Sequence, residues 1–200
     1  MSDKKFIITI GREYGSGGHE IAELISKQLN IPLYDRNIIA LASQASGITE
    51  ERLKESDERV GNPFFEPYLL NQYDYYNISQ KLFLTQCEIM KEKAEAGSAV
   101  FVGRCSDDVL QEVENAYHFF IWAPISDRIS RIMKVEQLDN YFAAERLVKQ
   151  TDKQRKAYYQ LYTDHKWGSY TGKDMVLNSS TLGIQKTAQI IIDFVSQALL

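Results

Sequence analysis

Short apolar runs recur along the chain, separated by longer segments of mixed polarity. Five of them are rich in β-branched or aromatic residues and are too short for helices: residues 6–10, 31–35, 99–102, 117–122 and 174–178. Runs that are apolar at nearly every position, such as residues 6–10 and 99–102, are typical of strands covered on both faces. The pattern therefore predicts a five-stranded parallel sheet buried between layers of helices.

The segments between these runs carry apolar residues at helical spacing. In residues 19–29 they recur every three to four positions, and Asn30 is suited to end that helix. The same reasoning predicts further helices at residues 37–45, 49–58, 78–96, 106–112, 124–135, 141–162 and 184–199. Residues 60–77 contain two prolines and six aromatic residues without helical spacing, which predicts an irregular segment packed over a cleft.

Composition and charge limit the class of protein. The chain has 200 residues, 44% hydrophobic and 25% charged, which indicates one globular domain. A net charge of -4 argues against a nucleic-acid surface. Cys87 and Cys105 form neither a disulfide framework nor a metal-binding spacing, so free thiols are expected. The apolar run at the N-terminus is too short for a signal peptide, and no run approaches the roughly 20 residues of a membrane span. We expect a cytoplasmic protein without nucleic-acid or membrane partners, as a monomer or homodimer.

A glycine-rich turn follows the first predicted strand, at the sheet edge where ligands bind in this class of fold. From Gly11 to Glu20 it reads GREYGSGGHE. Glycines let backbone N–H groups turn inward, and the following helix adds a partial positive charge at its start. The alternative is a plain tight turn, but the buried strand before it and the amphipathic helix after it favour a phosphate site. The predicted phosphate-binding and ATP-binding residues are Gly11, Gly15, Ser16, Gly17, Gly18, His19 and Glu20.

The turn departs from the common motif G-x-x-x-x-G-K-[ST]. Gly18 stands at the position of the lysine, and His19 and Glu20 stand where small and hydroxyl residues are usual. Arg12 and His19 can supply positive charge from the two ends of the turn, and Ser16 can offer a hydroxyl to Mg²⁺. Our hypothesis is that Arg12 and His19 supply the charge of the missing lysine, and which of the two replaces it stays open.

Further candidates follow the later strands. Asp35 can orient Mg²⁺ or accept a proton from the acceptor, and it can alternatively cap a helix. Arg36 is a candidate ligand for an acceptor phosphate. Arg104 follows the third strand, and its guanidinium group matches phosphate in a bidentate manner, although an ion pair is the alternative. Asp107 can cap the next short helix or contact the acceptor.

Basic residues gather in the predicted helices at residues 124–135 and 141–162. Arg128 and Arg131 are spaced to share a helical face, and Lys153 and Arg155 lie in the next helix. Four such charges usually form a solvated helix face, but in this architecture they can also cover a transferring phosphate. We assign a catalytic role to Arg131 and Arg155, together with Arg12 and Asp35. Nearby aromatic residues either pack as a satellite core, the preferred interpretation, or stack on a base: Tyr158, Tyr159, Tyr162, Trp167 and Tyr170.

Several segments resemble, in order, the cytidylate kinase-like proteins, which are relatives of bacterial cytidylate kinase among the nucleoside-monophosphate kinases. They are ITIGREYGSGGHEIAELISKQLNIPLYDRNII, VFVGRCSDDVL, DKQRKAYYQLYTDHKW and YTGKDMVLNSS. The pair Gly103-Arg104 resembles the family's GRD motif, with Cys105 in place of the aspartate. Asp35 matches the acidic position of the LDS-type motif, with Arg36 in place of the small residue after it.

This resemblance implies a three-layer α/β P-loop NTPase fold with a five-stranded parallel sheet. It also implies a helical substrate-binding insertion at about residues 36–97 and a basic lid at about residues 125–170. The implied activity is transfer of the γ-phosphoryl group of ATP, with Mg²⁺, to a nucleoside monophosphate such as CMP. Ser16 and Asp35 are then the candidate Mg²⁺ ligands, and Arg36, Arg104 and Asp107 the candidate acceptor residues. A nucleotide-binding or regulatory protein without turnover, or a kinase for another small phosphorylated acceptor, remains open.

Overall fold

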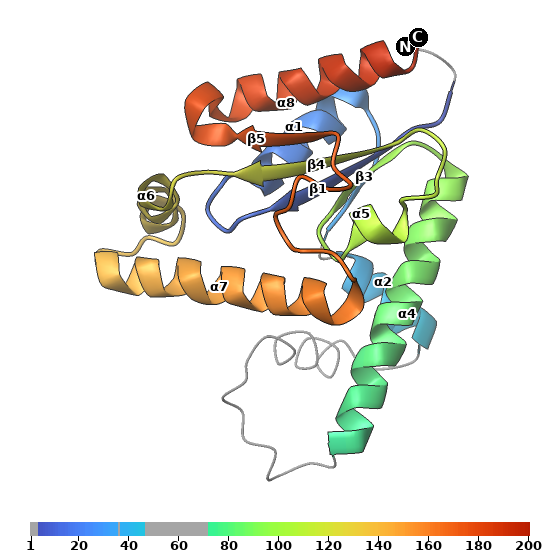
Figure 1. The fold of residues 1–200 in the computed structure, drawn as a ribbon, viewed down its shortest axis with the longest axis horizontal. Coiled ribbons are helices and arrows are strands. Elements are labelled where there is room, and N and C mark those ends of the chain that lie inside the picture. Colours follow the sequence, from blue (N-terminus) through green and yellow to red (C-terminus); the bar gives the residue numbers. More distant parts are fainter. Residues whose placement is uncertain (1–3, 36, 47–71) are drawn as a thin grey trace.

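A computed structural model describes residues 4–35, 37–46 and 72–200. Five strands form one sheet: β1 (Ile7–Arg12), β2 (Leu33–Tyr34), β3 (Ala99–Val102), β4 (Ala116–Trp122) and β5 (Met175–Asn178). Their order is β2-β3-β1-β4-β5, and every neighbouring pair is parallel (Figure 1). The predicted five-stranded parallel sheet is therefore confirmed.

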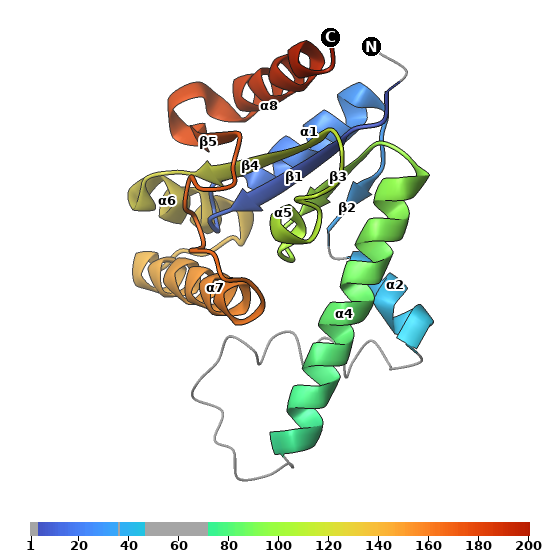
Figure 2. The ribbon, with the colours of Figure 1, turned by 45° about the vertical axis from the view of Figure 1, so that its right-hand side comes forward.

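Helices cover both faces of this sheet (Figures 1 and 2). They are α1 (Gly18–Leu29), α2 (Asn37–Ser46), α4 (Gln72–Ala96), α5 (Ser106–Val109), α6 (Ile125–Val135), α7 (Tyr141–Tyr162) and α8 (Ser179–Ala198). α1 and α8 pack together on one face, while α4 and α5 lie on the other. α6 and α7 pack against each other beside the carboxyl ends of the strands. The result is the predicted three-layer arrangement.

Alternate positions along β1 supply the two halves of the core. Ile8 faces the layer that contains Ile21 of α1 and Ile191 of α8, whereas Ile7 faces the layer that contains Met90 of α4. All five side chains are almost completely buried. Burial of each contributes about 1.5–3 kcal/mol, so the apolar runs seen in the sequence are what fix the strands in the centre of the molecule.

The register of the central strands sets the position of the site. Ile10 of β1 pairs with Val102 of β3 on one side and with Phe119 of β4 on the other. The amide of Gly103 donates to the carbonyl oxygen of Ile10 at 3.1 Å. The turn after β1 and the turn after β3 therefore lie next to each other.

Some boundaries differ from the prediction. The strand expected at residues 31–35 is only Leu33–Tyr34, and the helix expected at residues 106–112 ends at Val109. Residues 72–77, predicted to be irregular, belong to α4, and this prediction was wrong because both prolines that argued against a helix precede residue 72.

Two predicted segments lie outside the described residues, namely the helix at 49–58 and the irregular stretch at 60–71. Towards the C-terminus, α8 begins at Ser179 and is kinked at Gly183, whereas the predicted helix began after that glycine.

In the part of the chain that the structure describes, no helix combines the length and the apolar character that a membrane span requires.

Candidate active site

The turn between β1 and α1 contains backbone conformations that favour glycine. Gly15 and Gly17 have φ angles of 81° and 78°. A Cβ atom on Gly15 would lie 2.8 Å from the carbonyl oxygen of Arg128, and one on Gly17 would lie 2.2 Å from Cδ1 of Ile184. α1 begins at Gly18, and its first residues line a cavity, so the unpaired N–H groups of a helix start are available there. The turn therefore has the form of an anion-binding site.

The side chain of Arg12 crosses the site through space left by two glycines. A Cβ atom on Gly18 would lie 2.6 Å from Cβ of Arg12, and one on Gly103 would lie 1.8 Å from its Nη1. The guanidinium group then reaches Asp35, with Nη2 3.4 Å from Oδ1. A lysine at residue 18 would compete with Arg12 for the same space. The position of the Arg12 side chain thus explains why residue 18 is a glycine and not a lysine.

Asp35 follows β2, and its carboxylate contacts both Arg12 and His19. Its Oδ2 lies 2.8 Å from Nδ1 of His19, while its Oδ1 faces Arg12. Its backbone amide donates to Oδ1 of Asn37 at 2.8 Å, which fixes the loop before α2. The carboxylate therefore points towards the turn and does not cap α2.

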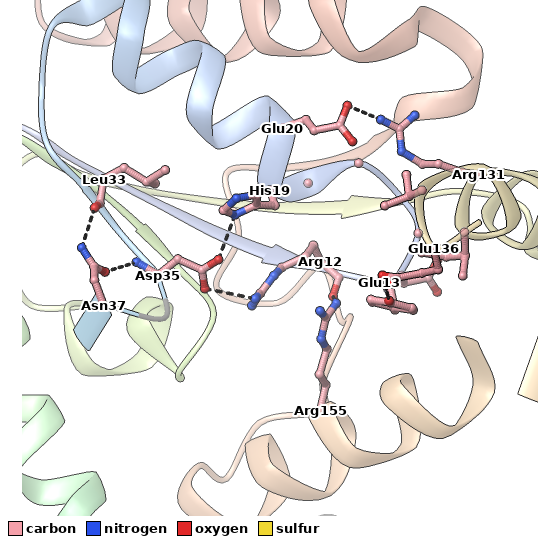
Figure 3. A pocket seen from close by; sticks show the side chains of 16 residues that line it. Arg12, Glu13, His19, Glu20, Leu33, Asp35, Asn37, Arg131, Glu136 and Arg155 are labelled. Atoms are coloured by element: carbon pink, nitrogen blue, oxygen red, sulfur yellow. Dashed lines mark hydrogen bonds and ion pairs between the residues drawn. The ribbon is translucent and has the colours of Figure 1, made fainter. Parts of the chain in front are cut away.

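The two other predicted catalytic arginines approach the turn from different helices (Figure 3). Arg131 of α6 forms an ion pair with Glu20 of α1. Arg155 of α7 donates from Nη1 to the carbonyl oxygen of Arg12 at 3.1 Å, and its guanidinium carbon lies 5.4 Å from the centroid of the Tyr14 ring. Both side chains line the same cavity as the turn. Glu20, predicted to bind ATP, thus holds Arg131 in this structure.

Two cavities meet at these residues. One has a volume of about 500 Å³ and is lined by the glycine turn and α6. The other has a volume of about 410 Å³ and is lined by the turn after β3 and by α7. Arg12, Asp35 and Arg155 line both cavities. This arrangement suits transfer of a group between two ligands, one in each cavity.

The turn after β3 lines the smaller cavity with strained backbone. Gly103, Arg104 and Cys105 have φ angles of 70°, 57° and 56°. Left-handed conformations cost roughly 1–2 kcal/mol at a non-glycine residue, and such strain gathers at functional sites. The turn brings the guanidinium carbon of Arg104 to 5.7 Å from the ring centroid of Tyr158. The predicted acceptor residue Arg104 therefore lies in the wall of the smaller cavity.

Asp107, in the short helix α5, also lines the smaller cavity. Its Oδ2 lies 2.6 Å from Nζ of Lys173 and accepts a hydrogen bond from the hydroxyl of Tyr159 at 2.8 Å. Burial and the adjacent carboxylate raise the pKa of Tyr159, so this hydroxyl remains protonated. The sequence indicated Asp107 but gave no sign that Lys173 would join it.

The remaining predicted site residues fall in different places. The hydroxyl of Ser16 donates to the carbonyl oxygen of Glu13 at 2.8 Å, and the residue is 2% exposed. Its predicted role as a Mg²⁺ ligand does not fit this inward orientation. Gly11 lines the smaller cavity, where a Cβ atom would lie 2.7 Å from Cδ2 of Phe120. Arg36 lies outside the described residues.

The aromatic residues in and after the last turns of α7 divide into three groups. Tyr158, Tyr159 and Trp167 line the smaller cavity. Tyr162 stacks on Phe83 of α4, with ring centroids 4.0 Å apart, as expected of a satellite core. Tyr170 is 81% exposed and belongs to neither. Packing thus explains part of the cluster, and the part at the cavity wall is available to a ligand.

Both cysteines are free thiols, as expected from the sequence. Burial raises the pKa of the Cys105 thiol, and it raises the pKa of Cys87 to about 11. Neither group is a thiolate near neutral pH, so the cysteine beside Arg104 is not a nucleophile.

Arg128 was expected among the solvated or phosphate-covering charges, and this prediction was wrong because the side chain is buried. It is 7% exposed, and it donates to the carbonyl oxygens of Ala123 and Tyr14 at 3.0 and 3.2 Å. It pairs with Asp152, and its Nε lies 3.2 Å from Glu13. Burial raises the pKa of Glu13, although the Ala123 amide and Arg128 partly offset this effect. Arg128 thus holds the back of the turn in position.

Comparison with known proteins gives one family. The model of the cytidylate kinase-like family matches residues 7–181. A protein named cytidylate kinase from Methanococcus aeolicus is 28% identical over 189 residues, which cover 92% of this chain and 94% of that protein.

Solved structures give the same picture. An uncharacterized protein from Eubacterium ventriosum is 26% identical, with a TM-score of 0.73 over 96% of this chain and 99% of that one. Shikimate kinase from Bacteroides thetaiotaomicron has a TM-score of 0.56 at 12% identity, over 96% of this chain and 99% of the other. A sugar kinase from Janibacter has a TM-score of 0.56 at 14% identity, over 98% of each chain. These last two likenesses concern the fold alone, which is the three-layer fold of P-loop kinases.

Proposed function

The chain belongs to the cytidylate kinase-like family, and from that premise we propose that it transfers the γ-phosphoryl group of ATP to a nucleoside monophosphate, with CMP favoured as acceptor. The observation that carries the proposal is the junction of the two cavities at Arg12, Asp35 and Arg155. The larger cavity contains the glycine turn and suits the triphosphate. The smaller cavity lies beyond the junction and suits the acceptor.

The charges of the smaller cavity support a phosphorylated acceptor. Among the described residues that line it are four cations and two carboxylates. A monophosphate carries nearly two negative charges at neutral pH, whereas a monocarboxylate such as shikimate carries one and a free sugar carries none. The cations are Arg12, Arg104, Arg155 and Lys173. A nucleoside monophosphate therefore fits better than the acceptors named for the more distant structural neighbours, and the name of the Methanococcus aeolicus relative favours CMP.

Catalysis in this proposal rests on position and charge, as in other phosphoryl transfers. Arg12 contacts the transferred group at the junction, in the role that lysine has in the usual motif. Arg155 lies beside it and offsets charge on the equatorial oxygens. Arg131 exchanges its ion pair with Glu20 for one with ATP, and Asp35 orients the acceptor.

The donor groups of the larger cavity fit the Mg²⁺ that the family implies. Carboxylate oxygens are its preferred protein ligands, and Asp35 and Glu20 both present them at the cavity wall. Either residue can hold the ion, while Ser16 is turned away. When bound, Mg²⁺ offsets the negative charge of the phosphate oxygens.

The test is a coupled ADP-release assay with ATP, Mg²⁺ and a panel of acceptors: CMP, dCMP, UMP, AMP and shikimate. We expect turnover with CMP, and a large loss of kcat/KM in Arg12→Ala. Lys149→Ala is a matched control, because this lysine is exposed and its ion-pair partner among the described residues is Glu145 on the same helix. Turnover with shikimate and not with any nucleotide would contradict the proposed acceptor.

One observation favours a second function, a nucleotide-binding protein without turnover. The lysine of the usual motif is absent, and Gly18 has no space for a side chain. This alternative predicts that ATP binds, as measured by calorimetry, while no acceptor in the panel yields ADP.

A further inference from the structure

A buried ion pair lines the smaller cavity. Lys173 and Asp107 have side chains that are only 7% and 8% exposed, and their charged atoms lie 2.6 Å apart. Burial of an ammonium group costs free energy unless its charge is compensated. A nearly buried lysine in a loop is therefore unusual, which suggests that it has a function. The two residues also line a neighbouring cavity of about 360 Å³, and they form the wall between the two spaces.

The pair leaves hydrogen-bonding capacity unused. Lys173 and the Tyr159 hydroxyl both bind Oδ2 of Asp107. Among the described residues Oδ1 has no hydrogen-bond partner. Nζ of Lys173 has three N–H donors, and within the same residues it contacts one oxygen acceptor, Oδ2 of Asp107, and lies 6.0 Å from the centroid of the Tyr159 ring. The wall therefore offers one acceptor and at least one donor side by side.

Aromatic rings line the same cavity as this pair. Phe120 and Trp167 contact each other edge to face, with centroids 5.4 Å apart. Arg12 and Arg155, which suit phosphate, also line this cavity. One cavity thus combines cationic groups with flat apolar surface and paired polar groups.

We propose that Lys173 and Asp107 are the specificity-determining residues for the acceptor, and that they bind the polar edge of its base. The inference rests on the proposed function and adds residues that select the substrate. The carboxylate accepts from an exocyclic amino group, and the ammonium donates to the adjacent ring nitrogen or carbonyl oxygen, while the rings pack on the base. An aminopyrimidine offers this donor and acceptor in neighbouring positions, whereas uracil presents a carbonyl oxygen to the carboxylate.

The test measures binding, with calorimetric titration of CMP, UMP and ribose 5-phosphate. Ribose 5-phosphate has the sugar and the phosphate but no base. In Lys173→Met we expect at least a tenfold loss of CMP affinity and an unchanged affinity for ribose 5-phosphate. The preference for CMP over UMP should shrink in Asp107→Asn. Asp108→Asn is the matched control, because Asp108 lies on the same helix but lines only the neighbouring cavity.

Removal of one partner can destabilise the fold, since it leaves a buried charge. The neutral double variant Lys173→Met/Asp107→Asn avoids this and should show the same selective loss. An equal loss for CMP and ribose 5-phosphate in a folded variant would overturn the inference, because the lysine would then bind phosphate. Unchanged CMP affinity would also overturn it. If the wild-type protein binds neither compound, the proposed function fails as well.

Discussion

Substitution of Gly18 by alanine tests the packing on which the interpretation of the turn rests. A Cβ atom at this position would lie 2.6 Å from Cβ and 3.0 Å from Cγ of Arg12. Overpacking of this kind typically costs about 1–3 kcal/mol. Alanine in place of glycine at a helix start gains at most about 0.5–1 kcal/mol. We therefore expect Gly18→Ala to lower the free energy of unfolding by about 1–2 kcal/mol.

The effect is measured by urea unfolding and by thermal melting. A change of 1 kcal/mol corresponds to about 2–4 °C in Tm for a domain of this size. In an Arg12→Gly background the same alanine meets no arginine side chain, so it should be neutral or stabilising. The double-mutant cycle thus isolates the contact between the two positions.

Gly97→Ala serves as the control, because a Cβ atom there would have no neighbour within 4 Å. It should leave the unfolding midpoint nearly unchanged. If Gly18→Ala is as stable as the wild-type protein, Arg12 does not occupy the space next to residue 18. The explanation for the missing lysine would then be wrong.

Three further predictions follow from the same contacts. Arg12→Ala should weaken ATP binding about 10- to 100-fold in calorimetry, because a charge-assisted contact to phosphate contributes about 1.5–3 kcal/mol; unchanged affinity would contradict its role. Arg128→Met should cost about 3–5 kcal/mol in urea unfolding, since it leaves the carboxylates of Glu13 and Asp152 without their buried partner, and Arg128→Lys should recover part of the loss. Burial lowers the pKa of His118 from its ordinary value of 6.5. The unfolded chain then binds that proton more readily, so the free energy of unfolding should fall as the pH drops below 6.5, and an NMR titration that places the His118 pKa at or above 6.5 would contradict this.

The sheet and the turn could be predicted because their signals are local. An apolar run followed by closely spaced glycines and an amphipathic segment specifies β1, the turn and α1 without knowledge of the rest of the chain. The position of a charged side chain relative to the core is not local. Arg128 and Arg131 are three residues apart on α6, and sequence spacing assigns them to one face, yet packing against Tyr14 and Asp152 buries the first.

Ser16 and Lys173 illustrate the same limit. A serine in a glycine turn is a reasonable metal ligand by type, but here its hydroxyl is used within the turn itself, three residues back along the chain. Lys173 follows a loop with no periodicity, and its partner lies 66 positions earlier, which only the tertiary fold brings close. Residue type and spacing identify candidate groups, whereas their partners depend on how the elements pack.

α7 accounts for the relation between the two cavities. Successive side chains on this helix contact the glycine turn, the junction of the two cavities, Asp107 and α4 in order. Asp152 accepts from the amide of Tyr14 at 2.7 Å, Arg155 binds the carbonyl oxygen at the end of β1, and the Tyr159 hydroxyl binds the carboxylate of Asp107. The Tyr162 hydroxyl donates to a carbonyl oxygen of α4 at 3.2 Å. Since one helix makes all four contacts, the spacing between the glycine turn and Asp107 is set by residues 152–162 as well as by the sheet. Under the proposed function, a shift of this helix would displace both substrates relative to Arg12, so α7 would also align them.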